Sequence, residues 1–369
     1  MSLFTLRGEL TKTQSIVLGL AGFVLFILAW WILAELLSVQ RPIVEFDDHP
    51  PSSLDSTDVF INQDSLARLD SIAFANATEF EKVYPILPTP MGVVKSYPSL
   101  IQDDNLAGNT FHSIWLNLQG YFWAIVLCIP IGFLIGLIPL FQGLFSKQVD
   151  ALRYLPLTAL TGLFIIWFGI DDKMKVAFLA FGILVYLLPV VVQRINEVDD
   201  VYLKTVFTLG ASPWETIRSV YMPSVFSKLI DDIRVLTAIS WTYIIIAELV
   251  NRQGGIGALI YLKSRQGYME KVFAILIVIV IIGFIQDRLF IYLDRRLFPH
   301  KFYKTTLTGL KEVEYGIFAM FGVIAVAVLL PIIWGGYPLA LNNLAFIVLI
   351  AALVIVIYGE FRLRQSLVK

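Results

Sequence analysis

The side chains that most often do chemistry in proteins are scarce in this 369-residue sequence. Its one cysteine, Cys128, lies in an apolar stretch, which excludes an internal disulfide and indicates a packed thiol. The three histidines, His49, His112 and His300, have no partners at metal-ligand spacing, so we expect no metal site. There is no G-x-x-x-x-G-K-S/T phosphate-binding loop. These absences argue against an enzyme and against a chain that binds ATP itself.

The most informative polar stretch is TLGASPWETIRSVYMP, at residues 208–223. Residues 200–209 predict a short helix that Gly210 ends, because glycine readily takes the left-handed conformation of a C-terminal cap. A second helix should begin directly afterwards. It has an S-x-x-E capping box and a proline at the first helical position, formed by Ser212, Pro213 and Glu215.

The second helix has one apolar face. Trp214, Ile217 and Tyr221 share it at helical spacing, and Pro223 is expected to interrupt the pattern. This pattern alone fits an amphipathic helix at the membrane surface and a docking helix about equally well.

The chain that must position this segment is too hydrophobic for a soluble protein. Hydrophobic residues make up 57% of it and charged residues only 15%, with a mean hydropathy of +0.76. Because about 20 apolar helical residues cross a bilayer, we predict an all-α polytopic membrane protein with about eight transmembrane helices. These helices are expected near residues 16–37, 112–139, 154–170, 176–195, 233–250, 272–292, 315–334 and 342–359. The first is too long and aromatic for a cleaved signal peptide, so we expect it to be retained.

The distribution of basic residues predicts the orientation. Lysine and arginine collect at both ends and after the sixth span, at Arg7, Lys12, Arg295, Arg296, Lys301, Lys304, Arg362, Arg364 and Lys369. An even number of spans then places both termini in the cytoplasm. The predicted divisions are an N-terminal segment with the first span, an acidic extracytoplasmic loop, a core that carries the segment 200–223, and a basic linker with two further spans, at residues 1–37, 38–110, 111–298 and 299–369.

The segment 200–223 resembles the coupling segment of binding-protein-dependent ABC importer permeases. That motif reads E-A-A, three residues, G, nine residues, a branched apolar residue, one residue, then L-P. With Gly210 as the glycine, the later positions are occupied by Val220, Met222 and Pro223. The E-A-A triplet is replaced by Lys204, Thr205 and Val206, which reverses a charge.

Other stretches are similar to the branch of permeases for nitrate, sulfonate, taurine and bicarbonate. They are VDALRYLPLTALTGLFIIWFGI at 149–170 and DDIRVLTAISWTYIIIAELVNRQGGIGALI at 231–260. The resemblance covers about residues 85–298 and implies a type I ABC importer permease fold. Asp232 stands where this branch commonly has glycine, and the acidic loop and the last two spans have no counterpart in the usual six-span form.

The resemblance also implies partners. A permease of this kind docks on a separate ABC ATPase subunit that binds ATP and Mg, so this chain would hold no cofactor. One coupling segment per chain implies a second permease chain, most simply in a homodimer. An extracytoplasmic solute-binding protein or lipoprotein and membrane lipid are the other expected partners, with no nucleic acid. The residues expected to couple to the ATPase are Lys204, Leu209, Gly210, Ala211, Ser212, Pro213, Trp214, Glu215, Arg218 and Pro223.

Polar side chains of the fifth span are candidates for the translocation pathway of a small, anionic solute. They are Arg234, Thr237, Ser240, Trp241, Thr242 and Glu248. Charges at membrane depth need a partner or a function. For Arg234 we favour an ion pair with Asp231 over contact with an anion. Trp241 fits packing equally well, and Glu248 fits a cap or a snorkelling group better than a gate. Residues 251–260 are predicted to form a re-entrant or surface turn.

Two other classes of protein fit the sequence less well. A secondary transporter or a channel-like protein not driven by ATP would normally show internal repeats and would not need the capped segment. A membrane enzyme would need a cluster of catalytic groups, which these spans lack. The sequence does not name the solute, choose between a homodimer and a heterodimer, or assign a role to the last two spans.

Overall fold

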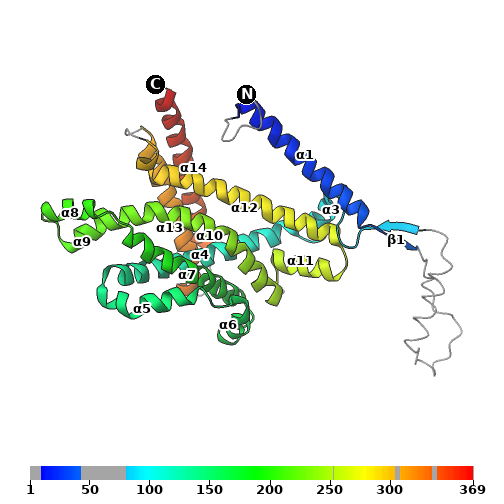
Figure 1. The fold of residues 1–369 in the computed structure, drawn as a ribbon, viewed down its shortest axis with the longest axis horizontal. Helices are drawn as coiled ribbons and strands as arrows, with labels where there is room; N and C mark the ends of the chain where they lie inside the picture. The colour runs from blue at the N-terminus through cyan, green and yellow to red at the C-terminus, as the bar shows by residue number, and fades with distance from the viewer. Residues whose placement is uncertain (1–9, 43–79, 252, 304–307, 335–338, 369) are drawn as a thin grey trace. The chain divides into compact units, whose positions relative to one another are not determined.

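The computed structural model describes residues 10–42, 80–251, 253–303, 308–334 and 339–368 (Figure 1). These residues form helices and one two-stranded antiparallel ladder. The chain divides into two compact units, one of Met1–Asp104 with Leu262–Leu276, the other of Asn105–Tyr261 with Ile277–Lys369. The units do not follow the four predicted divisions, which remain a prediction.

The first unit contains α1 (Lys12–Leu36), the strands β1 (Val39–Pro42) and β2 (Phe80–Val83), and α3 (Pro90–Gln102). A capping box of Thr11 and Gln14 begins α1. The strands pair in antiparallel register, with Val39 opposite Val83. The segment 38–110, predicted as one loop, therefore contains a ladder, α3 and the start of the next helix. Most of its acidic residues lie in 43–79, outside the described residues.

The second unit is built around three long helices: α4 (Leu106–Leu137), α7 (Asp172–Asn196) and α10 (Met222–Asn251). The helix α7 packs against both of the others. Small residues permit close approach, since a Cβ atom on Gly120 would lie 2.5 Å from a methyl group of Leu179. The buried Cys128 lies in this interface, as its packing in an apolar stretch predicted.

Between α4 and α7 the chain bends instead of crossing once. The helix α5 (Pro139–Leu152) is followed by a 3-10 turn (Leu157–Leu160) and by α6 (Thr161–Phe168), at an angle of 95° across the break. Leu155 precedes Pro156 and is therefore disfavoured in α-helix, which accounts for the break. The region predicted as a span by itself, 154–170, is instead the second arm of this bent pair, Pro139–Leu152 with Leu157–Phe168. The described residues contain seven apolar helices long enough to span, or up to eight if the bent pair is one span.

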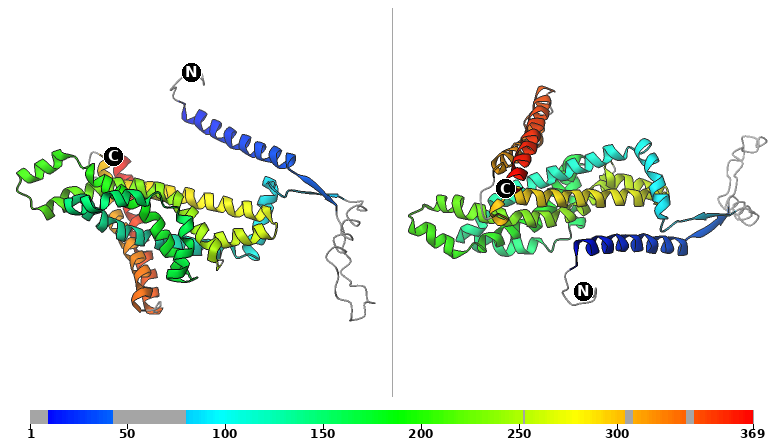
Figure 2. Two further views of the ribbon diagram at one scale, coloured as in Figure 1. Left: turned by 60° about the horizontal axis from the view of Figure 1, so that its bottom comes forward. Right: turned by 90° about the horizontal axis from the view of Figure 1, so that it is seen from above.

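The remaining helices are α11 (Ile256–Arg265), α12 (Met269–Leu297), α13 (Leu310–Trp334) and α14 (Leu339–Val368). The last two lie side by side, in orange and red in Figure 2. Arg296 on α12 forms a two-point ion pair with Glu360 on α14, with N–O distances of 2.5 and 2.9 Å. This pair holds the C-terminal helices against the end of α12.

Candidate functional site

The first half of the segment 200–223 has the predicted local structure. The helix α8 (Asp200–Thr208) ends before Gly210, whose φ is +79°. Ser212 then caps α9 (Pro213–Thr216), with the Ser212 hydroxyl accepting from the Glu215 N–H at 3.3 Å and the Glu215 carboxylate accepting from the Ser212 N–H at 2.7 Å. The predicted helix end and capping box are confirmed.

The second half differs from the prediction, because Pro223 does not interrupt the helix. A π-helical segment (Ile217–Tyr221) follows α9 and leads directly into α10. Within this wider turn the Met222 N–H donates to the carbonyl of Ile217. This wider turn accommodates Pro223, which has no N–H to donate to the preceding turn. The capped helix and the long helix α10 are consequently one continuous element.

The segment 200–223 carries large apolar side chains on its surface. Leu209 is 81% exposed, Trp214 64% and Phe207 58%. Thr216 and Val220 are buried, and Ile217 and Tyr221 are half-buried, so Trp214 points away from the face on which the segment rests. Ala211 is half-buried, and the other residues expected to couple to an ATPase are all exposed: Lys204, Leu209, Gly210, Ser212, Pro213, Trp214, Glu215, Arg218 and Pro223.

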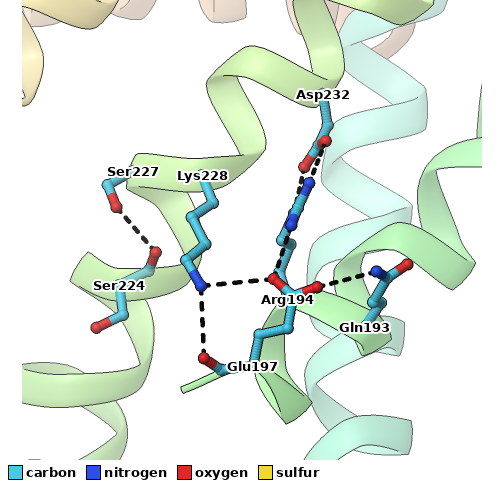
Figure 3. A network of polar contacts seen from close by, with 7 residues as sticks. All are labelled: Gln193, Arg194, Glu197, Ser224, Ser227, Lys228 and Asp232. Carbon is cyan, nitrogen blue, oxygen red and sulfur yellow. Dashed lines mark hydrogen bonds and ion pairs between the residues drawn. The ribbon is translucent and has the colours of Figure 1, made fainter. Parts of the chain in front are cut away.

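A network of charges lies at the base of the segment (Figure 3). Arg194, in the last turn of α7, donates from two nitrogens to both carboxylate oxygens of Asp232 on α10, each at 2.7 Å. A third nitrogen of Arg194 donates to Glu197 at 2.7 Å. Glu197 also accepts from Gln193 at 2.9 Å and from Lys228 at 3.4 Å. Two-point pairs of this kind fix orientation as well as distance.

The sequence did not reveal this network, because its two halves are far apart in the chain. Arg194 and Asp232 are separated by 38 positions, beyond any helical spacing. The one signal was Asp232, a carboxylate at a position where the resemblance leads one to expect glycine. Hydrogen bonds from Arg194 and Gln193 hold the pKa of Glu197 below its usual value, so the carboxylate stays ionised at neutral pH.

Most of the proposed pathway residues on α10 face the interior of the chain. Thr237, Ser240 and Trp241 are each 5% exposed or less. The Ser240 hydroxyl donates to the Asn117 side-chain oxygen at 3.2 Å, and the Trp241 indole donates to Gln286 at 2.6 Å. Trp241 is therefore packed inside the chain, which is one of the two roles expected for it. Thr242 is exposed instead, on the same stripe as Asp231, Val235 and Ala238.

Arg234 does not take the predicted partner on its own helix. It pairs with Asp287 on α12, with 2.5 Å between Nε and Oδ1. Asp231 pairs instead with Lys301, at 3.3 Å. The helix α12 brings a carboxylate to Arg234 across the helix interface, which sequence spacing could not indicate.

Glu248 is fully buried, so the snorkelling alternative is wrong. Its carboxylate accepts from the Ser113 hydroxyl at 2.6 Å and from the Gly257 N–H at 2.7 Å. Ser113 in turn accepts from the Ile256 N–H at 2.9 Å. Gly255, with φ of +99°, lies directly against the carboxylate. Glu248 therefore holds the turn before α11 against α4.

Comparison with known proteins finds sequence similarity to transport permeases. Residues 128–299 match the family described as binding-protein-dependent transport system inner membrane component. A putative aliphatic sulfonates transport permease protein of Bacillus subtilis is 29% identical, covering 58% of this chain and 77% of the relative. A probable ABC transporter permease protein of Brucella melitensis is 27% identical, covering 58% and 86%. The taurine transport system permease protein of Escherichia coli is 25% identical, covering 66% and 90%.

The helices and these relatives define a membrane permease. Residues 128–299 match the inner membrane components of binding-protein-dependent transport systems, and the comparisons support a translocation-pathway subunit of an ABC importer. The prediction of a mainly helical membrane protein with about eight apolar helices is confirmed for the described residues, and the comparisons favour the predicted importer function over a transporter not driven by ATP.

Proposed function

We propose that the segment 200–223 docks on a separate ABC ATPase subunit and carries the force of ATP-driven closure into α10. The observation that supports this most directly is the continuity of the capped helix with α10 through the π-helical segment. A push on the segment is a push on a long membrane helix. The exposed Trp214, Leu209 and Phe207 supply an apolar anchor of the kind that dominates docking interfaces.

The importer we propose contains two permease chains, most simply two copies of this one. The exposed stripe of α10, formed by Asp231, Val235, Ala238 and Thr242, is a face on which two copies could enclose a pathway. ATP and Mg belong to the ATPase, which binds on the cytoplasmic side with both termini of this chain. A solute-binding protein or lipoprotein delivers the solute from outside, and lipid of a prokaryotic inner membrane surrounds the complex.

The solute we propose is a small organic anion of the sulfonate type. Relatives named for aliphatic sulfonates and for taurine support this class. On this chain, Arg234 is about a third exposed in its side chain and lies beside the exposed stripe. Thr242 adds a hydroxyl donor on the same helix. Both would be available to an anion along the pathway, whereas Thr237, Ser240, Trp241 and Glu248 would act by supporting the helix.

A reconstituted complex tests the coupling proposal. The permease is combined in proteoliposomes with its ATPase and binding protein, and uptake and ATP hydrolysis are measured together. The triple variant Gly210→Val, Ser212→Ala, Trp214→Ala should insert normally but lose ATPase binding and uptake, because the docking face and the ends of the short helix are damaged. Tyr154→Ala, which removes another highly exposed aromatic side chain of the same unit, is the control. Full solute-stimulated hydrolysis and full uptake in the triple variant would contradict the proposal.

A further inference from the structure

We propose that Arg194, Glu197, Lys228 and Asp232 form a clamp that makes the coupling segment move as one body with α7 and α10. The four residues are positioning residues: they touch no solute and act through the segment 200–223. The proposal rests on the coupling function proposed above and adds the residues that set its efficiency.

The first argument is where the clamp lies in the chain. Glu197 caps the end of α7, three residues before α8 begins, and Lys228 lies on α10 beyond the π-helical segment. Their contact joins positions 31 residues apart, with the whole coupling segment between them. Lys228 also donates to the Glu197 carbonyl at 3.4 Å. The clamp therefore ties together the two ends of the segment that would receive the push.

The second argument is the geometry of the central pair. Arg194 and Asp232 meet through two parallel bonds of 2.7 Å, which restrain the angle between α7 and α10 as well as their separation. Their side chains are 27% and 18% exposed, so bulk water screens the pair only in part. A single-point surface pair would allow the two helices to pivot.

The third argument is that one residue of the clamp, Arg194, bonds to two carboxylates at once. Figure 3 shows Arg194 between the carboxylates of Asp232 and Glu197, with Lys228 reaching the same Glu197 oxygen from α10. Arg194 thus joins α7 to α10 through Asp232 and also binds Glu197 at the base of the segment. If the segment is displaced while this arrangement holds, α7 and α10 must follow. If it is broken, the segment and α10 can move while α7 stays.

An ordinary stabilising ion pair would behave differently from a positioning clamp. Loss of stability lowers the amount of folded complex, but each surviving complex still moves the same amount of solute per ATP. Loss of positioning leaves assembly and ATP hydrolysis intact and lowers the number of solute molecules taken up per ATP hydrolysed. That ratio is the quantity to measure.

The experiment uses the full importer in proteoliposomes with Asp232→Asn, with Glu197→Gln, and with the exchanged pair Arg194→Asp together with Asp232→Arg. The control is Asp150→Asn, which breaks the exposed pair with Arg153 at 3.0 Å in the same unit. We expect Asp232→Asn to bind the ATPase normally and to lower uptake per ATP by about threefold to tenfold, in line with coupling within one charged network. Glu197→Gln should lower it less, the exchanged pair should recover part of the loss, and the control should match the wild type.

The outcomes separate the two proposals. A wild-type ratio of uptake to hydrolysis in both Asp232→Asn and Glu197→Gln, whatever their thermal stability, would overturn the clamp. If Asp232→Asn does not assemble, the ratio in Glu197→Gln decides alone. Wild-type complexes in which ATP hydrolysis drives no uptake would instead overturn the proposed coupling function itself.

Discussion

The two ends of α10 are held in different ways. Near the N-terminal end, Asp232 meets Arg194 in a charge pair that solvent partly reaches. Near the C-terminal end, Glu248 is fully buried, and its recorded hydrogen bonds come from neutral donors, the Ser113 hydroxyl and the Gly257 N–H. One end is fastened by opposite charges, the other by a buried carboxylate inside a turn.

The contacts at the two ends of α10 should respond differently when the helix is displaced. Separating a partly exposed charge pair costs less free energy than separating fully buried groups, because water replaces part of the lost interaction. A buried carboxylate that loses its donors has no such replacement, so its surroundings resist rearrangement. We therefore expect the C-terminal end of α10 to be the fixed end, and the N-terminal end, which Arg194 ties to α7, to be the adjustable end that moves with the segment 200–223.

The largest expected effect is at the fixed end, from Gly255→Ala. A Cβ atom there would overlap the Glu248 carboxylate, and φ of +99° is strained for alanine. We expect a loss of roughly 3 kcal/mol or more in stability, seen as a lower midpoint of thermal unfolding in detergent. Gly254→Ala is the matched control, since its φ is +73° but its Cβ would find no atom closer than 3.7 Å. Equal destabilisation by both would contradict the role given to Glu248.

A smaller effect is expected from Ser113→Ala, which removes the donor to Glu248 and the acceptor for the Ile256 N–H together. Leaving the buried Ile256 N–H and one of the two Glu248 carboxylate oxygens without the Ser113 hydroxyl should cost about 2 kcal/mol in thermal stability. Ser227→Ala is the comparison, because that hydroxyl only bonds the nearby Ser224 carbonyl. If the two variants unfold alike, the buried turn does not hold the fixed end of α10.

At the adjustable end, Ser212→Ala should have a local effect of about 1 kcal/mol, the usual worth of an N-cap. Faster hydrogen exchange at the amides of residues 214–216 would report it, while the global unfolding midpoint should stay unchanged. Ser219→Ala removes a hydroxyl that bonds only the carbonyl one turn back, and it should leave those amides protected. Unchanged exchange in Ser212→Ala would show that the π-helical segment alone holds the short helix.

The smallest expected effect appears with pH. The pKa of Glu197 is lowered in the folded chain by Arg194 and Gln193, so its stabilising contribution is present above the unfolded pKa and is lost as pH falls through the folded one. The stability difference between the wild type and Glu197→Gln should be constant near neutral pH. It should shrink as pH falls below the ordinary glutamate pKa of about 4.3. A difference that grows in acid would have the wrong sign for this network.

Several features of this protein could be predicted because they depend on neighbours in the sequence. The end of α8 at Gly210 and the capping box of Ser212 and Glu215 involve residues at most three positions apart. Apolar length predicted most of the spans in the same way, with one exception. The region 154–170 is apolar, as predicted, but it belongs to a bent helix pair, because hydropathy does not detect a bend.

The partners of the charged and polar groups could not be predicted, because they come from other helices. Arg234 was expected to pair one turn away and instead meets Asp287, 53 positions on. Asp232 had no evident role until α7 placed Arg194 beside it. Pro223 was expected to end a helix and instead follows a π-helical segment that accommodates it.

The sequence by itself determined the class of this protein, because span length, end caps and motif spacing are properties of short stretches of chain. It also determined which segment lies between the apolar stretches, since the polar residues that mark this segment are close together in the sequence, at 200–223. Only the tertiary structure decided that this segment continues into α10, which charges hold its base, and that Glu248 is buried at the opposite end. Each of these depends on which helix faces which, and that choice is made by packing between residues far apart in the chain.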